Sequence, residues 1–369
     1  MTAALAHLSV LEVGDDSGAY AAKLFAGLGA RVMRAVLPPT SSIDGLNVDP
    51  DPVVEGFLHR SKTTVILPVD PEERTKALLE MIEVADILIE SGPPDVLARF
   101  GIPSSHPVLD RIDLVRTRVS PYGLDGEHAL DPASDLVCSA SAGFLSLGGW
   151  PDRAPTRAFG DQSWRMASLY AAVGSMVAIL ERDESGIGQQ VDVNAQEAVS
   201  TALENSLQYY DLEHVERRRT GAGYSEAGSG VYACADGYVY VMVGRLSTAQ
   251  GWVNLLNWLD EEKVEGASEL RLPNWTDHTF RQSDHAQTRF REIFDAFAKD
   301  RPKAELYVEA QQRNIAICPI NSPDDLLESD QLRARNFFVH SGDATFVGAP
   351  YRLSKTPWVL EPSVSEVQP

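Results

Sequence analysis

The chain has 369 residues, 44% of them hydrophobic, and a net charge of −21. This length predicts a large core and more than one domain. The acidic balance argues against a nucleic-acid partner, which needs a basic surface. It does not exclude an anionic small molecule bound in a local basic pocket.

Cysteine usage and the N-terminal segment indicate the compartment. Cys138, Cys234 and Cys318 lie far apart and show no Cys-x-x-Cys spacing. This predicts a reducing compartment, no disulfide framework and no metal site built on thiolates. Residues 1–7 lack the basic and apolar regions of a signal peptide, and no window approaches about 18 uncharged apolar residues. We therefore expect a cytoplasmic protein without a membrane partner.

The first half of the chain alternates between strand and helix patterns. Residues 8–13 predict a strand, 19–28 a helix and 31–36 a second strand, which together form a βαβ unit and hence part of a parallel sheet. The alternation recurs in a strand over 63–67, a helix over 71–84, and strands over 86–89 and 113–119. Residues 37–56 and 120–134 have loop composition.

The pattern changes in the second half. A long apolar helix after Asp161 is followed by a strand over 191–193 and a helix over 197–210. Beyond residue 217, glycine-rich loops and the alternating stretch 238–243 predict a smaller α+β domain. We expect a last strand near 316–320 and a helix over 329–336. The predicted division is a large α/β domain over 1–215, a small domain over 216–315, and a segment over 316–369 that returns to the large domain.

Asp161 is the principal candidate for chemistry. It follows a glycine and precedes the long helix, whose apolar residues are spaced three and four apart. In one interpretation it caps the helix by accepting hydrogen bonds from the first N–H groups. In the other, a carboxylate held ionised at a helix N-terminus acts as a nucleophile.

Residues 12–18 form the first turn after a strand and invite comparison with nucleotide-binding loops. The stretch is not Gly-x-Gly-x-x-Gly, and Asp15 and Asp16 would repel a pyrophosphate, so a Rossmann NAD site is disfavoured. The same letters resemble the first motif of S-adenosylmethionine methyltransferases. That alternative is weakened because the strand over 31–36 does not end in an acidic residue.

Six parts of the chain, in order, carry a further set of motifs: residues 16–34, 59–65, 85–101, 119–123, 185–193, and 319–321 with 335–338. Together they resemble family III CoA-transferases, the CaiB/BaiF family, which includes formyl-CoA transferase, carnitine CoA-transferase and α-methylacyl-CoA racemase. Residues 185–193 (Ser-Gly-Ile-Gly-Gln-Gln-Val-Asp-Val) match the family's Thr-Gly-x-Gly-Gln-x-Val-Asp-Val closely. The resemblance extends over nearly the whole chain.

The resemblance implies a fold and a mechanism. The fold is a Rossmann-like large domain with a parallel sheet plus a smaller α+β domain, assembled as an interlaced homodimer. Asp161 stands where the family has its nucleophile, which forms a mixed anhydride and then an aspartyl-CoA thioester. Gly228, Ser229 and Gly230 are the candidates for a mobile glycine loop whose N–H groups stabilise oxyanions.

The resemblance also implies CoA contacts. They are Asp16, Ser17, Arg34, Lys62, Leu67, Ser91, Arg99 and Phe100. Among these, the three cations Arg34, Lys62 and Arg99 are expected nearest the nucleotide phosphates. The alternative for any surface cation is plain solvation.

The chain departs from the family pattern at several positions. Asp15 and Asp16 precede the first helix, and Arg165 replaces a glycine four residues after the nucleophile. A racemase would need a His beside an Asp in the loop after residue 123 as an acid–base partner. The chain reads Ser134-Asp135 there, which disfavours racemase activity.

We therefore expect a CoA-transferase that moves CoA from an acyl-CoA to a carboxylic acid, with coenzyme A entering as part of the substrate. The alternative is a non-catalytic or partner-dependent subunit that binds CoA thioesters. A homodimer is expected, or a heteromer with a related chain. Racemase and methyltransferase activities are less favoured.

Overall fold

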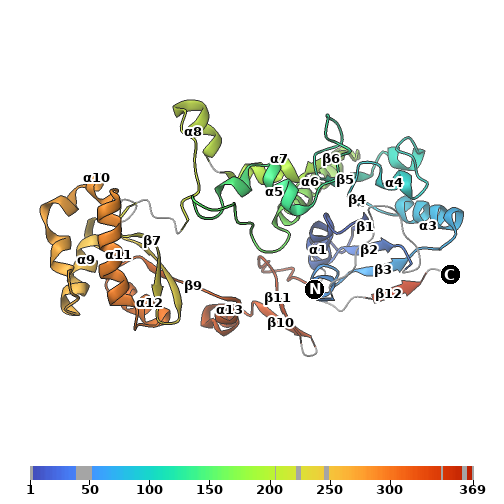
Figure 1. The fold of residues 1–369 in the computed structure, drawn as a ribbon. Helices are drawn as coiled ribbons and strands as arrows, with labels where there is room; N and C mark the ends of the chain where they lie inside the picture. The colour runs from blue at the N-terminus through green and yellow to red at the C-terminus, as the bar shows by residue number, and fades with distance from the viewer. Residues whose placement is uncertain are drawn as a thin grey trace. The chain divides into compact units, whose positions relative to one another are not determined.

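The computed structural model describes residues 3–38, 52–203, 205–221, 226–244, 249–341, 344–359 and 364–367. The chain divides into two units (Figure 1). The first contains Met1–Ser146, Arg157–Arg217 and Asn336–Pro369, and the second contains Leu147–Thr156 and Arg218–Arg335. The segment that returns to the first unit therefore begins at Asn336 rather than at residue 316.

The first unit is built on a seven-stranded sheet in the order β12-β3-β2-β1-β4-β5-β6, with every neighbouring pair parallel. Its strands are β1 (Ser9–Gly14), β2 (Arg31–Val36), β3 (Thr63–Ile66), β4 (Ile87–Ser91), β5 (Val115–Ser120), β6 (Gln190–Asn194) and β12 (Val364–Val367). The α/β class and the parallel sheet expected from the sequence are confirmed. Strand β12 had no local signal.

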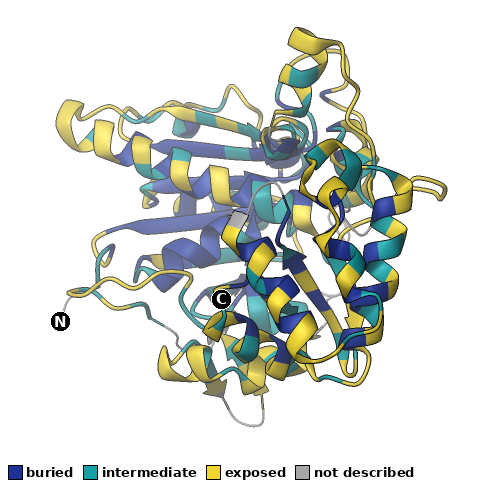
Figure 2. Cartoon of the chain, turned by 90° about the vertical axis from the view of Figure 1, so that its left-hand side faces the viewer, coloured by how far each residue is buried: buried dark blue, intermediate teal, exposed yellow. Residues whose placement is uncertain are grey.

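Helices cover both faces of this sheet. The helices of this unit are α1 (Ala19–Gly27), α2 (Pro52–Leu58), α3 (Pro71–Glu83), α4 (Val96–Arg99), α5 (Asp135–Ser141), α6 (Gln162–Ser185), α7 (Ala195–Ser200) and α8 (Ser206–Glu213). Helix α8 has no buried residue and does not take part in this cover. Successive residues of a strand point to opposite faces. Accordingly, Val10 packs in a core with α1 and α6, whereas Leu11 packs in a second core with α3 and α4. The central strands are buried on both sides, as Figure 2 shows.

Helix α6 is long and apolar enough to cross a membrane by length and composition alone. It packs against α1, α7 and β5, and its residues Ala167, Ala171 and Ile179 are buried in the core of the first unit. The apolar composition of its inner face therefore has an explanation within the folded unit.

The second unit contains an antiparallel sheet of β7 (Ser229–Cys234), β8 (Gly237–Met242) and β9 (Ile317–Ile320). Its larger helices are α9 (Ala249–Glu261), α11 (Asp284–Ala298) and α12 (Lys303–Gln312). Tyr232, Trp258, Phe290 and Phe294 form much of its core. The shorter elements are α10 (His278–Arg281), α13 (Pro323–Glu328) and α14 (Asp330–Ala334), and a hairpin of β10 (Phe338–Ser341) and β11 (Ala344–Val347) follows in the first unit.

Several element boundaries differ from expectation. The single helix expected over 197–210 is two, α7 and α8, and that expected over 329–336 is found as the shorter helix α14. The expected loop over 37–56 includes the start of α2, and the rest of it from residue 39 to 51 lies outside the described residues. Helix α5 was not expected, because a seven-residue helix carries little periodic signal.

Candidate active site

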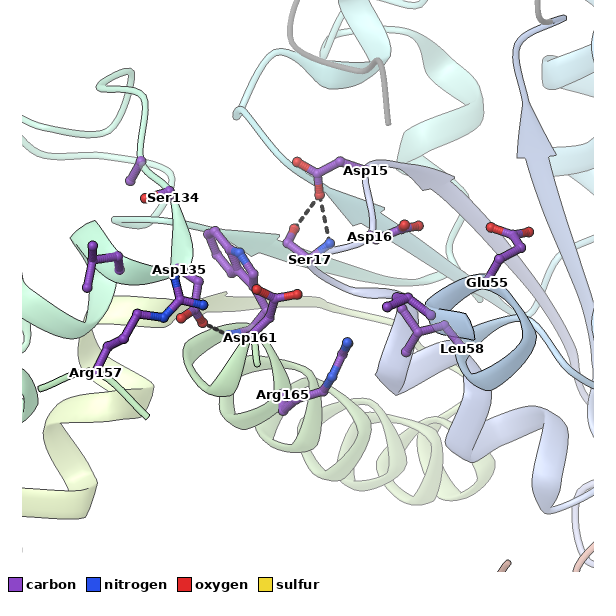
Figure 3. A pocket seen from close by; sticks show the side chains of 14 residues that line it. Asp15, Asp16, Ser17, Glu55, Leu58, Ser134, Asp135, Arg157, Asp161 and Arg165 are labelled. Carbon is purple, nitrogen blue, oxygen red and sulfur yellow. Dashed lines mark hydrogen bonds between the residues drawn. The ribbon is translucent and has the colours of Figure 1, made fainter. Parts of the chain in front are cut away.

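Helix α6 begins directly after Asp161, which occupies its N-cap position. An N-cap aspartate ordinarily accepts hydrogen bonds from the N–H groups two or three residues further on. The Asp161 side chain makes no such bond, and its backbone (φ −98°, ψ 67°) is not in the extended conformation usual for a cap. Its carboxylate is exposed and borders a cavity (Figure 3). The capping interpretation thus finds no support in this geometry.

Asp135, the first residue of α5, caps α6 instead. Its Oδ1 accepts from the backbone N–H of Ser163 at 2.6 Å and of Trp164 at 3.4 Å. The Ser163 hydroxyl donates to the Asp135 carbonyl at 3.0 Å. Sequence reasoning missed this role. The pair Ser134-Asp135 is typical of a helix start, but only the fold shows that this start meets the start of α6.

The cavity bordered by Asp161 has a volume of about 460 Å³ and lies within the first unit. Its charged lining consists of the carboxylates Asp15, Asp16, Glu55, Asp135 and Asp161 and the arginines Arg157 and Arg165. Trp164 and Leu58 add apolar surface. The cavity therefore joins the end of β1 to the start of α6, and its charge is predominantly negative.

Arg165 lies one turn into α6 and is half-buried. Its guanidinium carbon is 5.9 Å from the centre of the Tyr20 ring. Burial lowers the pKa of Arg165, against the opposing attraction of Asp161 and Asp16. The residue that departs from the family's glycine thus places a cation beside the candidate nucleophile.

A second cavity, of about 510 Å³, adjoins the first and shares Asp135, Arg157 and Arg165 with it. Its remaining wall is largely apolar and includes the aromatic residues Tyr20, Phe144, Phe159 and Tyr351. The start of α6 is therefore bordered by an acidic cavity and an aromatic cavity, with the two arginines common to both.

Two carboxylates follow the end of β1, and their pKa values are shifted in opposite directions. The Asp15 carboxylate accepts from the N–H of Ser17 at 2.9 Å and from its hydroxyl at 2.5 Å, and burial raises the pKa of Asp15. Burial also opposes the ionisation of Asp16. Hydrogen bonding to His59 and the charges of His59 and Arg34 outweigh it, so the pKa of Asp16 is lowered.

Lys62 is at the centre of a buried charged cluster below this strand end. Its ammonium group donates to Glu12 at 2.5 Å and to the carbonyl of Ala19 at 2.9 Å, and lies 3.1 Å from His59 Nδ1. Lys62, Glu12 and His59 are each at most 2% exposed. Burial lowers the pKa of Lys62, against the attraction of Glu12. The structure corrects the expected contact between Lys62 and a CoA phosphate, because the Lys62 side chain is buried inside the core and bonded to Glu12.

The other expected CoA contacts separate into four groups. Asp16 and Ser17 line the cavity with Asp161. Arg34 pairs with Asp16 at 3.2 Å and with Glu55 at 2.7 Å. Leu67 and Phe100 are buried in the core, and the buried Ser91 donates its hydroxyl to the Asp15 carbonyl. Arg99, in contrast, is partly exposed and pairs with Asp95. Of the three expected phosphate contacts, Arg99 is the most accessible.

Gly228, Ser229 and Gly230 belong to the second unit, where Ser229 and Gly230 begin strand β7 and pair with Met242 and Val241 of β8. The N–H of Ser229 donates to the Glu226 carbonyl at 3.2 Å. Ser229 is buried. Ser229 and Gly230 are therefore in a strand, with Gly228 in the turn before it, and the mobility expected of this segment stays a prediction. Residues 222–225, which precede it, lie outside the described residues.

Within the described residues, Glu12, Asp16 and His59 are the one group whose potential metal-binding atoms lie within 4.8 Å of one another. Lys62 already bonds Glu12 and His59, and Arg34 pairs with Asp16. A metal ion would have to compete with these two cations. The donor set thus fits an internal ion-pair network better than a metal centre.

The fold places the chain among doubly wound α/β proteins, with a candidate nucleophile at the start of a long helix. The sequence matches CoA-transferase family III over residues 5–364. The chain therefore belongs to CoA-transferase family III, and the expected enzyme class, a CoA-transferase, is confirmed.

Individual relatives agree with this assignment. The chain is 35% identical to a subunit of succinyl-CoA:(R)-benzylsuccinate CoA-transferase from Thauera aromatica, over 95% of this chain and 88% of that one. It is 26% identical to formyl-CoA:oxalate CoA-transferase from Streptomyces avermitilis, over 97% and 91%. A crystal structure of a CaiB/BaiF family protein from Brucella suis shares its fold, with a TM-score of 0.82, 20% identity and coverage of 98% and 95%.

Proposed function

We propose that the protein transfers CoA from an acyl-CoA to a carboxylic acid, with the Asp161 carboxylate as nucleophile. The observation that carries this proposal is that Asp161 stands at the start of α6 without capping it, so its carboxylate borders the cavity unengaged by the helix. Among the described residues it accepts no hydrogen bond from a protein group.

The chemistry proceeds in four balanced steps. The Asp161 carboxylate attacks the thioester carbonyl, and CoA thiolate leaves a mixed anhydride behind. The thiolate then attacks the Asp161 carbonyl carbon and releases the donor acid, which gives an aspartyl-CoA thioester. The acceptor carboxylate attacks this thioester to form a second anhydride and thiolate. Attack of the thiolate on the acceptor acyl carbon yields the new acyl-CoA and frees Asp161.

The charges of the site support a particular placement of the substrate. A cavity with five carboxylates repels nucleotide phosphates, so we place the uncharged pantetheine arm and the thioester there and the phosphates outside it. Arg157 and Arg165 border both cavities and are the cations suited to hold the carboxylates of the donor and acceptor acids.

The aromatic cavity supports an acid with an aryl substituent. Phe144, Phe159 and Tyr351 offer apolar surface next to the two arginines. The relative from Thauera aromatica is named for succinyl-CoA and benzylsuccinate. We therefore propose succinyl-CoA as donor and an aryl-substituted dicarboxylic acid as acceptor. The competing outcome is that unsubstituted succinate or malate is transferred equally well.

The test is mass spectrometry after incubation with succinyl-CoA, with and without hydroxylamine. We expect an acyl or CoA adduct on the peptide that contains Asp161, converted by hydroxylamine to the hydroxamate and absent in Asp161→Asn. Asp183→Asn is the matched control, because Asp183 is an exposed carboxylate near the other end of α6. An adduct that persists in Asp161→Asn contradicts the assignment of the nucleophile.

A second candidate is a subunit that acts only with a related chain. Relatives from Thauera aromatica and Chloroflexus aurantiacus are named as subunits, those from Chloroflexus aurantiacus as the alpha subunit of a succinyl-CoA–L-malate CoA-transferase. Helix α6 also carries an apolar stripe that the single chain leaves at least half exposed: Leu169, Val173, Val177 and Leu180. Such a stripe is suited to a subunit interface. We propose a dimer, interlaced as the resemblance implies, with the stripe in its interface.

Light scattering on the purified chain tests the assembly. A dimer that forms the Asp161 adduct supports a complete homodimeric enzyme. A chain that binds succinyl-CoA without forming an adduct, and gains activity on addition of a related chain, supports the partner-dependent subunit.

A further inference from the structure

We propose that Asp135 is a positioning residue that keeps Asp161 available for catalysis by taking over the capping of α6. This inference rests on the proposed function in one respect, that Asp161 is the nucleophile. It adds a role for a second carboxylate, on a different helix, that the motifs of the sequence did not single out.

The argument begins with the two donors at the start of α6. Counted from the N-cap at Asp161, Ser163 and Trp164 are the second and third helical residues. These are the positions whose N–H groups an N-cap aspartate accepts. Both are directed to Oδ1 of Asp135, at 2.6 Å and 3.4 Å. The two carboxylates therefore compete for the same pair of donors, and Asp135 holds them.

Asp135 is itself fixed in place by neighbouring contacts. It begins α5, whose N-cap Ser134 accepts from the N–H of Val137 at 3.4 Å, and its carbonyl accepts from the hydroxyl of Ser163 at 3.0 Å. One turn further along α5, Cys138 is fully buried in the core of the first unit. The capping carboxylate therefore stands on a helix anchored to the core, and Figure 3 shows it beside Asp161 at the cavity.

The consequence for Asp161 follows from the physics of a helix start. The unpaired N–H groups and the dipole attract the nearest carboxylate. While Asp135 satisfies them, rotation of the Asp161 side chain onto its own helix gains little. Without Asp135, the Asp161 carboxylate becomes the nearest acceptor for both donors, and capping α6 draws it away from the thioester.

A double-mutant cycle in urea unfolding tests the competition without any substrate. In the wild type, we expect Asp161→Ala to change the unfolding equilibrium constant by less than about twofold, because Asp161 makes no cap. In an Asp135→Ala background, the same change should raise it by about fivefold or more, because Asp161 has then become the cap. Equal costs of Asp161→Ala in the two backgrounds would overturn the proposal.

Two further variants keep the cycle interpretable. Asp135→Asn retains an acceptor oxygen, so the cost of Asp161→Ala in that background should lie below its cost with Asp135→Ala. It also supplies a cycle if Asp135→Ala does not fold. Asp131→Ala removes an exposed carboxylate four residues earlier, which pairs with His128 and lines neither cavity. No coupling to Asp161 is expected there, and coupling as large as with Asp135→Ala would overturn the proposal.

A chemical readout separates positioning from plain stabilisation. With saturating succinyl-CoA, Asp135→Ala should slow formation of the Asp161 adduct by about tenfold or more, and Asp135→Asn should restore part of the rate. An unchanged adduct rate in folded Asp135→Ala overturns the positioning role and leaves the nucleophile assignment standing. If the wild type forms no adduct on Asp161, the proposed function fails, and the unfolding cycle still decides whether the two carboxylates compete.

Discussion

Two charged regions of the first unit, the cluster around Lys62 and the start of α6, combine carboxylates with cations in opposite ways. The cluster holds Lys62, Glu12 and His59 at most 2% exposed, and each charge is paired. At the start of α6, Asp161 and Arg157 are exposed and border cavities. The sequence motifs suggested function for both regions. The comparison indicates that paired, buried charges stabilise this fold, whereas accessible charges beside a cavity are suited to chemistry.

Asp161→Asn should have the largest effect on activity and little effect on the stability of the fold. We expect the turnover number to fall by about 10³-fold or more, since an amide cannot serve as the nucleophile. The free energy of unfolding should change by less than about 0.5 kcal/mol, because the side chain does not cap α6. Steady-state rates and urea unfolding measure both. A folded variant with a turnover number near that of the wild type would remove Asp161 from the mechanism.

Lys62→Met should have a large effect on the stability of the fold. It leaves the Glu12 carboxylate buried without its partner, at a cost of about 3–5 kcal/mol in the free energy of unfolding. Lys76→Met is the matched control. Lys76 pairs with Glu80 at 3.9 Å on an exposed helix face, and its loss should cost at most about 0.5 kcal/mol. Similar costs for the two lysines would mean that the cluster is not a structural ion-pair network.

Lys23 is another buried cation, and its effect on the free energy of unfolding should depend on pH. Its ammonium group donates to the Phe57 carbonyl and lies over the Phe57 ring, and burial, followed by the charges of Lys62 and Arg60, lowers its pKa to about 8 from 10.5. Between these pH values the unfolded chain binds the proton and the folded chain does not, so this group makes the free energy of unfolding rise with pH. Below pH 8 its charge is a burden on the folded state.

The test compares Lys23→Met with the wild type by urea unfolding at pH 7 and pH 10. The advantage of Met over Lys should shrink by about 1–3 kcal/mol as the pH rises across this window. Lys76→Met, which removes an exposed lysine, should show no such trend. A difference between Lys23→Met and the wild type that stays constant with pH would refute the lowered pKa.

The sequence predicted the elements with strong local patterns. The strand over 31–36 coincides with β2, and the helix over 19–28 with α1 to within a residue. Parallel pairing followed from the βαβ alternation. Strand β12 could not be predicted, because its pairing with β3 is decided by a contact about 300 residues away in sequence. Helix α5 was not predicted, because it is short and its position depends on its contact with the start of α6.

In the candidate site, too, local patterns could be predicted from the sequence and long-range contacts could not. Position in a motif identified Asp161, because a carboxylate between a glycine and a long helix is a local pattern. Burial is not local: Lys62 and Arg99 both appear as motif cations, yet Lys62 is sealed by Glu12 and Arg99 is accessible. The role of Asp135 depends on two helix starts meeting in space, which spacing along the chain cannot reveal.

Arg99 should show the smallest effect on stability and a specific effect on binding. It ends α4, is partly exposed and pairs with Asp95 four residues earlier at 3.0 Å. Exposed pairs of this kind contribute little, so Arg99→Ala should cost at most about 0.5 kcal/mol in the free energy of unfolding. If Arg99 binds a CoA phosphate as the family resemblance implies, the dissociation constant of CoA should rise about threefold to tenfold at low salt.

High salt separates this effect from a disturbance of the fold. Screening weakens exposed charge interactions, so calorimetric titration should show a smaller loss of CoA affinity in Arg99→Ala at about 0.5 M than at about 0.05 M salt. Arg271→Ala is the control, because Arg271 pairs with Asp260 at a comparable exposure in the second unit. Equal CoA affinities for the wild type and Arg99→Ala would show that Arg99 does not bind a CoA phosphate. None of the three expected phosphate contacts would then be supported, because Lys62 is buried and Arg34 is already paired with Asp16 and Glu55. The phosphates would then have to be bound by residues outside the motifs.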